Sequence, residues 1–425
     1  MLYLESFAHR VQFAEVVSRW VVNQPLPNDV QTLKEIINFN SYIARIWADD
    51  LATTLLRDVY GDTPRSLLCK TKGELKDFVT SSEPRYRNER IEQIFRNYKE
   101  FPEDYYRDTP YDGRAYYLEG KNGQAPTYVG STRLKRFRRI AEKGSRRIVD
   151  YLVERIRANA DALAEERARR LGIPKDQLIT PKEEQVAEFA HAERRLLRMI
   201  RQGSIQAEFP ILSIPDAVGI KIITEADQYE RLIDSLHRSP TCNLLEVEQH
   251  SGRYNAINLR VAYTIPRDLL RKRPPNAAAM KVLAYRGIDP ATVHERYNHF
   301  LDTAEDHVLL EIIVSSYQEF LESEVGRSMH EDRIFDQRSS DEYKAHLAVN
   351  VLYLMDYILS LCLSPQGGEV DDVPIKIWVK YMPDTMDRLF RRLFRLPVDA
   401  SFDDAFNGDA PEPGMPPALL RALVK

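Results

Sequence analysis

The sequence predicts an α+β fold, in which a mixed β-sheet is flanked by a large N-terminal helical region and by C-terminal helices. Between residues 204 and 320, short runs rich in Val and Ile alternate with amphipathic stretches, which is typical of a mixed sheet. The segments before and after carry apolar residues at helical spacing. The chain has 425 residues, 43% hydrophobic and 29% charged, which fits a globular protein of two or three domains.

The N-terminal part, up to about residue 110, is expected to be helical. Residues 28–61 form one long pattern with a cap at Asn28 or Asp29 and a closing Gly61. The stretch 86–117 is dense in Tyr and acids and is expected to be a loop packed by its own aromatic rings. Residues 114–131 then predict a β-hairpin that turns at Asn122 and Gly123.

A basic helical segment follows the hairpin. Residues 133–147 contain eight Lys or Arg and one acid, Glu142. Charges this dense repel each other unless a partner is present, so the run could meet RNA, DNA or a triphosphate, or it could be a solvated helix face. A second helix is predicted at 182–203, after Pro181.

The sheet region has a definite predicted order of elements. We expect a strand at 219–223, a helix, two strands at 243–249 and 256–264, a helical insertion over 276–303, a strand at 308–314 and a helix at 317–326. An apolar helix at 341–363, a strand at 374–382 and a basic helix at 384–395 come next.

These patterns predict four parts. They are a helical domain at 1–112, a hairpin and basic connector at 113–185, the sheet domain at 186–330, and a C-terminal helical extension with a Pro-rich tail at 331–425. The prediction leaves the oligomeric state open.

Composition excludes several classes of protein. The net charge of −4 excludes a polycation, and three scattered cysteines without a CxxC pair argue against a disulfide framework or a zinc site and fit the cytoplasm. The N-terminus is not a secretory signal. The apolar run 346–363 contains Asn350 and Asp356, so we expect a buried helix and no membrane partner. The chain has no P-loop.

Two acidic residues stand out because they occur in apolar, strand-like runs. Asp216 opens the first predicted strand and Glu311 lies inside the last one. Two such carboxylates could hold one Mg²⁺ together with substrate phosphates. In the alternative reading, Asp216 caps a turn after Pro215 and Glu311 pairs with Lys221.

Three short motifs in this region resemble the synthetase domain of the RelA/SpoT family, over residues 198–324. The family's Asp-x-x-Gly-x-Arg is matched by Asp216, Gly219 and Lys221, and its Gly-Tyr-x-Ser-x-His run by the segment 253–258, which contains Tyr254 and Asn258. Its Glu-Ile-Gln-Ile-Arg-Thr strand corresponds to the segment that begins at Glu311. Upstream, basic and Ser-Ile elements are echoed by Arg198, Ser204 and Ile205.

The resemblance implies a nucleotidyltransferase-like core and a specific activity. ATP would donate pyrophosphate to the 3′-hydroxyl of a guanosine nucleotide or another nucleotide acceptor. Asp216 would hold Mg²⁺, and Glu311 would bind the metal or activate the hydroxyl. Tyr254 would stack on the acceptor base, Asn258 and Ser204 would contact the nucleotide, and donor phosphates would meet three cations, Lys221, Arg198 and Arg201.

Several family cations are absent from this chain. Ile200, Glu208, Ile313 and Ser315 stand where the family carries Lys, Lys, Gln and Arg, and Asn258 stands for the family's His. Either other basic residues rebuild the phosphate site, from the 133–147 run or from a ridge near Arg388 and Arg391, or catalysis is lost. The alternative prediction is therefore a catalytically degenerate nucleotide- or RNA-binding protein of the same fold, and a purely structural helical scaffold is a third.

Overall fold

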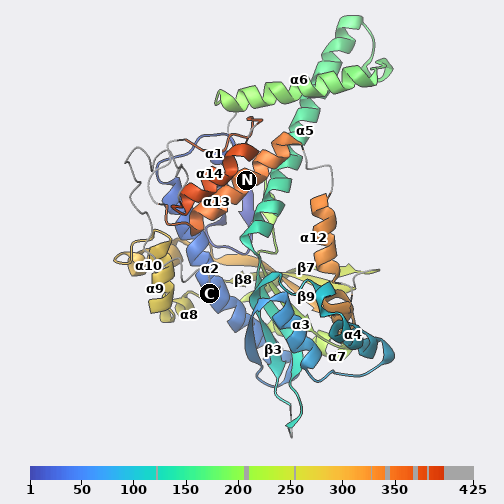
Figure 1. Ribbon diagram of the computed structural model, residues 1–425, viewed down its shortest axis with the longest axis vertical. Coiled ribbons are helices and arrows are strands. Elements are labelled where there is room, and N and C mark those ends of the chain that lie inside the picture. Colours follow the sequence, from blue (N-terminus) through green and yellow to red (C-terminus); the bar gives the residue numbers. More distant parts are fainter. Residues whose placement is uncertain are drawn as a thin grey trace, which may run out of the picture.

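The protein folds around one large sheet, and a helical arm extends from it (Figure 1). The computed structural model describes residues 1–120, 123–204, 210–252, 255–326, 328–339, 345–366, 372–380 and 382–396. The arm consists of α5 (Phe137–Leu171), a short 3₁₀ turn, η3 (Lys175–Gln177), and α6 (Lys182–Arg201), which packs back on α5.

The sheet has seven strands in the spatial order β2-β3-β4-β6-β9-β8-β7. The strands are β2 (Arg65–Thr71), β3 (Pro110–Leu118), β4 (Thr127–Leu134), β6 (Val218–Ile223), β7 (Cys242–His250), β8 (Ala256–Thr264) and β9 (His307–Ser315). Strands β6 and β9 are parallel and the other neighbouring pairs are antiparallel. The predicted α+β class with a mixed sheet is therefore confirmed. A two-stranded parallel sheet joins β1 (Leu2–Leu4) to β5 (Leu212–Ile214).

The predicted order of elements between 218 and 326 is also confirmed. Strand β6 is followed by α7 (Ala226–Arg238), by the β7–β8 hairpin, and by an insertion of three helices, α8 (Arg267–Lys272), α9 (Ala277–Tyr285) and α10 (Val293–Thr303). Strand β9 then leads into α11 (Tyr317–Leu321) and a π-helical turn, η4 (Glu322–Gly326).

One face of the sheet is covered by α2 (Asp29–Tyr60) and forms an apolar core with it. Ile220, Ile222 and Ile312 lie in this core, and each is at most 1% exposed. Helix α2 ends at Gly61, whose φ of 73° is the left-handed conformation that glycine adopts without strain. Helix α1 (Arg10–Val21) and α7 extend the same core.

The opposite face is covered over only part of its width. Helices α3 (Lys72–Ser81) and α4 (Glu89–Glu100), with a 3₁₀ turn η1 (Pro102–Tyr105), α11 and η4, form a second core with the half of the sheet that contains β2, β3 and β4. Polar and charged side chains of β4, β6, β8 and β9 occupy the remaining part of this face, and several of them are only half-buried. This is the part of the sheet that can meet a ligand.

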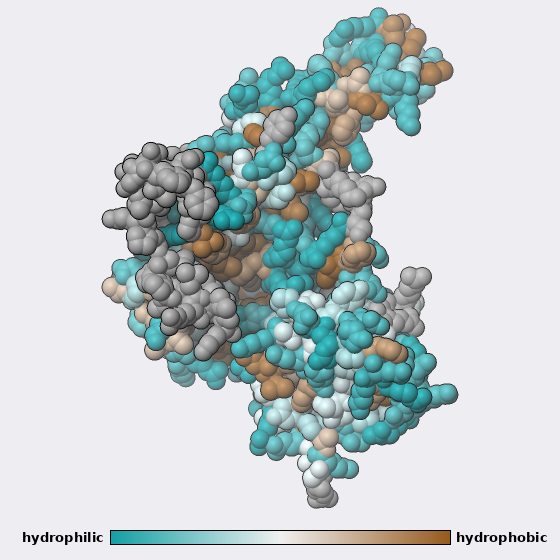
Figure 2. Space-filling view, in the orientation of Figure 1, coloured by the Kyte–Doolittle hydropathy of each residue, from teal (hydrophilic) through white to brown (hydrophobic). Residues whose placement is uncertain are grey.

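Three C-terminal helices complete the described chain. They are α12 (Met329–Ser339), α13 (His346–Leu363) and α14 (Pro383–Leu393). Helix α13 is long and apolar enough to span a membrane, and 67% of that window is buried inside the protein, where α13 packs on α5 and α2. A core helix passes the same test of length and composition. Figure 2 shows that the visible surface is mostly hydrophilic, with hydrophobic residues near the end of the arm.

Three parts of the chain differ from the predicted pattern. The stretch 86–117, predicted to be a loop, contains α4, η1 and most of β3. Strand β2 lies within residues 1–112, for which only helices were predicted, and β3 crosses the predicted boundary at 112. Both strands belong to the sheet, so the N-terminal region contributes to the same layer as the rest. The strand predicted at 374–382 is wrong, because the described residues 372–380 form bends, turns and irregular backbone and no strand.

Candidate functional site

Asp216 lies immediately before β6, where the chain enters the partly covered face of the sheet. Its Oδ2 accepts hydrogen bonds from two lysines, from Lys135 at the end of β4 and from Lys143 on α5, the latter over 2.6 Å. Its Oδ1 is buried and has no hydrogen-bond partner among the described residues. Burial alone would raise the pKa of Asp216, but Lys135 and Lys143 outweigh burial and hold that pKa well below its ordinary value. Asp216 is therefore ionised, and one of its two oxygens has no hydrogen-bond partner among the described residues.

Glu311 lies on the same face, because its β9 position pairs with Gly219 of β6, three residues after Asp216. Asn258 of β8 donates from Nδ2 to Glu311 Oε1 over 2.9 Å and also lies 2.9 Å from His250 Nε2. Burial, and next the negative charge of Asp216, raise the pKa of Glu311. A carboxylate with a raised pKa can accept a proton from a substrate hydroxyl more readily than an ordinary one.

Two further cations extend the site across the sheet. Arg133 of β4 pairs with Gly219 in register, and Lys221 follows two residues later on β6. Burial lowers the pKa of Lys221. Burial opposes the charge of Arg133 too, but neighbouring acidic groups outweigh it and raise the pKa of that guanidinium. Those groups are Tyr111, Glu324, Asp216 and Glu311. Arg133 is thus within electrostatic reach of both carboxylates of the site.

A second ionic cluster lies beyond Lys221, under α3 and η4. Glu324 of η4 pairs with Lys72 and, over 3.5 Å, with Lys221. Glu331 of α12 lies 3.3 Å from the same Lys72 Nζ. Burial alone would lower the pKa of Lys72, but the carboxylates of Glu324 and Glu331 outweigh it and raise that pKa. This cluster is closed, because the side chains of Lys72 and Glu324 are 6% and 7% exposed.

A pocket of about 400 Å³ opens at the end of the parallel strands β6 and β9. It contains both polar and acidic groups, and the residues that line it include Glu225, Tyr229, His250, Asn255 and Glu319. His250 contacts Asn258, which donates to Glu311, so two side chains link the pocket to Glu311, whereas Asp216 lies before the opposite, amino end of β6. The carboxyl ends of parallel strands are a common ligand position in α/β sheets.

The structure brings together four of the residues predicted for the site: Asp216, Glu311, Asn258 and Lys221. The alternative prediction, in which Asp216 caps a turn and Glu311 pairs with Lys221, does not agree with these contacts. Lys221 pairs with Glu324, and Asp216 pairs with two lysines. Tyr254 lies outside the described residues.

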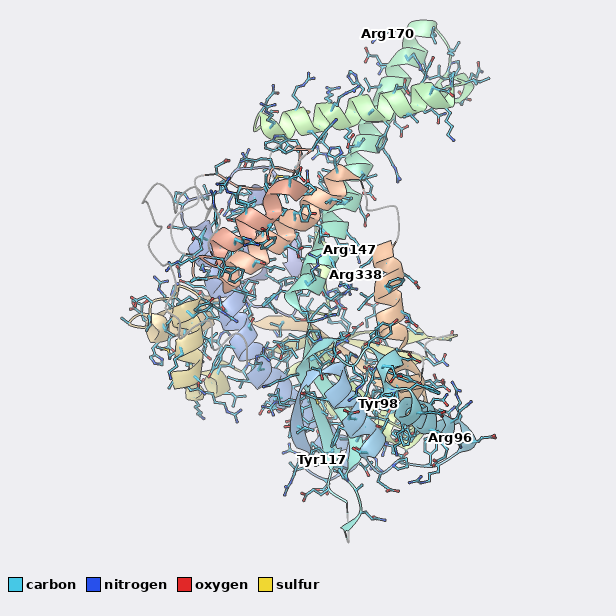
Figure 3. All side chains as sticks on the ribbon, viewed as in Figure 1. Arg96, Tyr98, Tyr117, Arg147, Arg170 and Arg338 are labelled. Atoms are coloured by element: carbon cyan, nitrogen blue, oxygen red, sulfur yellow. The ribbon has the colours of Figure 1, made fainter. Side chains whose placement is uncertain are left out.

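Three predicted residues lie elsewhere. Arg198 and Arg201 are exposed on the last turn of α6, and Ser204 caps the end of that helix by donating to the Met199 carbonyl. Figures 1 and 3 show α6 well separated from the sheet, on the arm whose far end carries Arg170. Helix α5 has 35 residues, about 50 Å of rise, and this length carries α6 away from Asp216.

The basic run 133–147 supplies the cations that the α6 residues do not. Arg133, Lys135 and Lys143 all face the site, whereas other members of the run are paired within the protein, Arg138 with Asp356 and Arg139 with Glu142. The high charge density of the run indicated in the sequence that it could supply these cations. It did not show which of its side chains face the site.

The donor set fits Mg²⁺ better than a transition metal. Mg²⁺ is usually held by one or two carboxylates plus substrate phosphates, and Asp216 Oδ1 is a buried carboxylate oxygen without a partner. In the described part of the chain, no group of three or more His, Cys, Asp or Glu side chains could hold a metal by itself.

Comparisons of the chain with protein-family models, with curated proteins and with solved structures found no match. The chemistry of the site therefore rests on its own residues.

Proposed function

We propose that this protein transfers pyrophosphate from ATP to the hydroxyl of a nucleotide, with a guanosine nucleotide as the first acceptor to test. The observation that supports it most is that one face of the sheet carries two carboxylates and three cations close to one another. They are Asp216 and Glu311 with Arg133, Lys135 and Lys143. Phosphoryl transfer depends mainly on positioning and on neutralisation of phosphate charge.

Each residue has a distinct role in this proposal. Asp216 would hold Mg²⁺, which would polarise the donor phosphates when bound. Lys135 and Lys143 keep Asp216 ionised, and because burial lowers the pKa of Lys135 to about 7, the more exposed Lys143 supplies the positive charge for the phosphates of ATP. Glu311, with its raised pKa, accepts the proton of the acceptor hydroxyl, and Asn258 orients Glu311. The pocket beside His250 receives the acceptor nucleoside.

The test uses ATP labelled at the γ-phosphate, Mg²⁺ and a panel of GTP, GDP, ATP and tRNA as acceptors. We expect label transfer to at least one acceptor, and a loss of about 10³-fold or more, roughly 4 kcal/mol of transition-state stabilisation, in Asp216→Asn and in Glu311→Gln. Asp227→Asn, an exposed acid on α7, is the matched control and should keep full activity. Transfer that persists in both site variants would refute these roles.

A second candidate is a nucleotide-binding protein that does not catalyse transfer. It is favoured by the fact that Asp216 is already neutralised by two lysines. Wild-type protein that binds Mg·ATP without transferring label to any acceptor would select this candidate. In that case Lys143→Ala should weaken ATP binding about tenfold. Arg147→Ala should not, because Arg147 is exposed one turn along α5 without an ion pair among the described residues.

A further inference from the structure

Helix α12 is attached to the protein mainly through polar contacts. Of its described side chains, residues 331–338, only Glu331 is buried. Asp332 accepts a hydrogen bond from the Tyr106 hydroxyl over 2.8 Å, and Arg338 donates to Glu142 of α5 over 2.8 and 3.0 Å. A helix that buries so little apolar surface can detach at a small free-energy cost.

The contacts of α12 engage cations that lie next to the proposed phosphate site. Glu331 lies 3.3 Å from Lys72 Nζ. On α5, Arg139 donates to the Gln337 side-chain oxygen over 3.2 Å, and Arg146 donates to the Gln337 backbone carbonyl over 2.5 Å. Three cations, Lys72 of α3 and Arg139 and Arg146 of α5, therefore contact oxygen atoms of α12.

Two of these cations belong to the same face of α5 as Lys143. Arg139, Lys143 and Arg146 are spaced by four and three residues, which places them in one row along the helix. Lys143 is the residue that holds Asp216. Figure 3 shows Arg338 at the end of α12 close to the part of α5 that carries Arg147, in agreement with the bond from Arg338 to Glu142.

We propose that α12 is an autoinhibitory strap, whose carboxylate and amide oxygens occupy cations that a polyphosphate binds when the strap is displaced. The polyphosphate is the triphosphate of the donor in the proposed function, on which this inference rests. Because the strap and the ligand use the same cations, binding of one weakens binding of the other by the same factor.

The strap is favoured over a purely structural role by the kind of contacts it makes. A structural helix is normally held by an apolar face, whereas α12 buries one carboxylate, and Oε2 of that Glu331 has no partner among the described residues. A polyphosphate would pair Lys72, Arg139 and Arg146 with full negative charges. Lys72 and Arg139 also pair with the carboxylates of Glu324 and Glu142, so the polyphosphate would have to compete with these two acids as well as with α12.

The test measures binding of inorganic triphosphate with Mg²⁺ by calorimetry, together with hydrogen–deuterium exchange of the full chain. Triphosphate should speed amide exchange in 331–338. Arg338→Ala and Tyr106→Phe each remove one surface tether, so both should speed exchange there and raise triphosphate affinity about fivefold. The control is Arg333→Ala on the same helix, exposed and without an ion pair among the described residues, which should change neither.

Two results would overturn the strap. Slower exchange in 331–338 on binding triphosphate would mean that α12 closes over the ligand, and faster exchange in Arg338→Ala with unchanged affinity would mean that α12 does not compete with it. Neither measurement needs label transfer. If triphosphate binding changes amide exchange in 331–338 but no label is transferred, the strap is supported and the proposed enzymatic activity is rejected. If label is transferred but binding and exchange are not linked, the activity is supported and the strap is rejected.

Discussion

Two acids on the same side of the molecule are each held by two lysines, but their surroundings are opposite. Asp216 is paired with Lys135 and with Lys143, whose side chain is 39% exposed, and one Asp216 oxygen has no partner among the described residues. Glu324 is 7% exposed, and both of its oxygens are taken, by Lys72 and Lys221. The two clusters therefore differ in one lysine and one oxygen: Lys143 reaches the surface, and the buried Oδ1 of Asp216 has no partner among the described residues, whereas both oxygens of Glu324 are paired inside the protein.

The largest expected difference between the two clusters is in stability. Glu324→Gln should lower the free energy of unfolding by about 3–5 kcal/mol, because two lysines would lose their buried counterion. Asp216→Asn should lower it by less, about 2–3 kcal/mol, because only Lys143 can turn to water and Lys135, 9% exposed, would stay buried without its counterion. Urea denaturation of both variants measures this, with Asp227→Asn expected within about 0.5 kcal/mol of wild type. Equal losses would remove the distinction between a closed and an open cluster.

Glu311 differs from Asp216 in that its pKa is raised and not lowered, so its effect on protein stability should depend on pH in the opposite sense. The ordinary value is 4.5 and the folded protein raises it, so folding favours the protonated form. Its stabilising contribution is present below the unfolded pKa and is lost as pH rises through the folded pKa. Glu311→Gln should therefore raise stability by about 1 kcal/mol at pH 7, and this gain should vanish near pH 4.

Denaturation of wild type and Glu311→Gln across this pH range tests the sign. Exposed Glu230→Gln is the control and should show no such pH-dependent gain. If Glu311 is the catalytic base, the rate of label transfer should also rise with pH through the same raised pKa. A Glu311→Gln variant that is less stable at pH 7 would contradict the burial argument.

The strands around the site were predictable because their patterns are strong. Val218–Ile223 and His307–Ser315 are short apolar runs that each contain one charged residue facing the ligand side, Lys221 and Glu311. Strand β2 was missed because it lies at the sheet edge. Four of its seven residues are exposed, two are half-buried and only Cys69 is buried, so the sequence shows no clear alternation of apolar and polar residues. The segment 374–382 has the β-branched and aromatic residues typical of a strand. It forms no strand because it pairs with no other strand in the described part of the chain.

Of the site residues, the two acids could be argued from physical chemistry alone. Asp216 and Glu311 were recognisable because charged residues in apolar strands need partners. Asn258 and the cations Lys221, Arg198 and Arg201 were implied by the resemblance to the RelA/SpoT family, and a short motif does not show where the helix that carries Arg198 and Arg201 lies. Lys135 and Lys143 lie far from Asp216 in the sequence, and only the fold brings them to it.

Salt provides the smallest and most selective test of the two clusters. A double-mutant cycle with Asp216→Asn and Lys143→Ala should give a coupling energy of about 1 kcal/mol at 0.1 M NaCl, and this should fall by about half at 1 M because the partly exposed pair is screened. The equivalent cycle with Glu324→Gln and Lys72→Met should give a larger coupling that salt leaves almost unchanged, since ions do not reach a pair that is 6% and 7% exposed. Unfolding free energies of the four variants and the two double variants at both salt concentrations supply the numbers. A coupling that falls equally in both cycles would mean that the Glu324 cluster is open to solvent, and the two clusters would then have to be treated as one ligand-accessible surface.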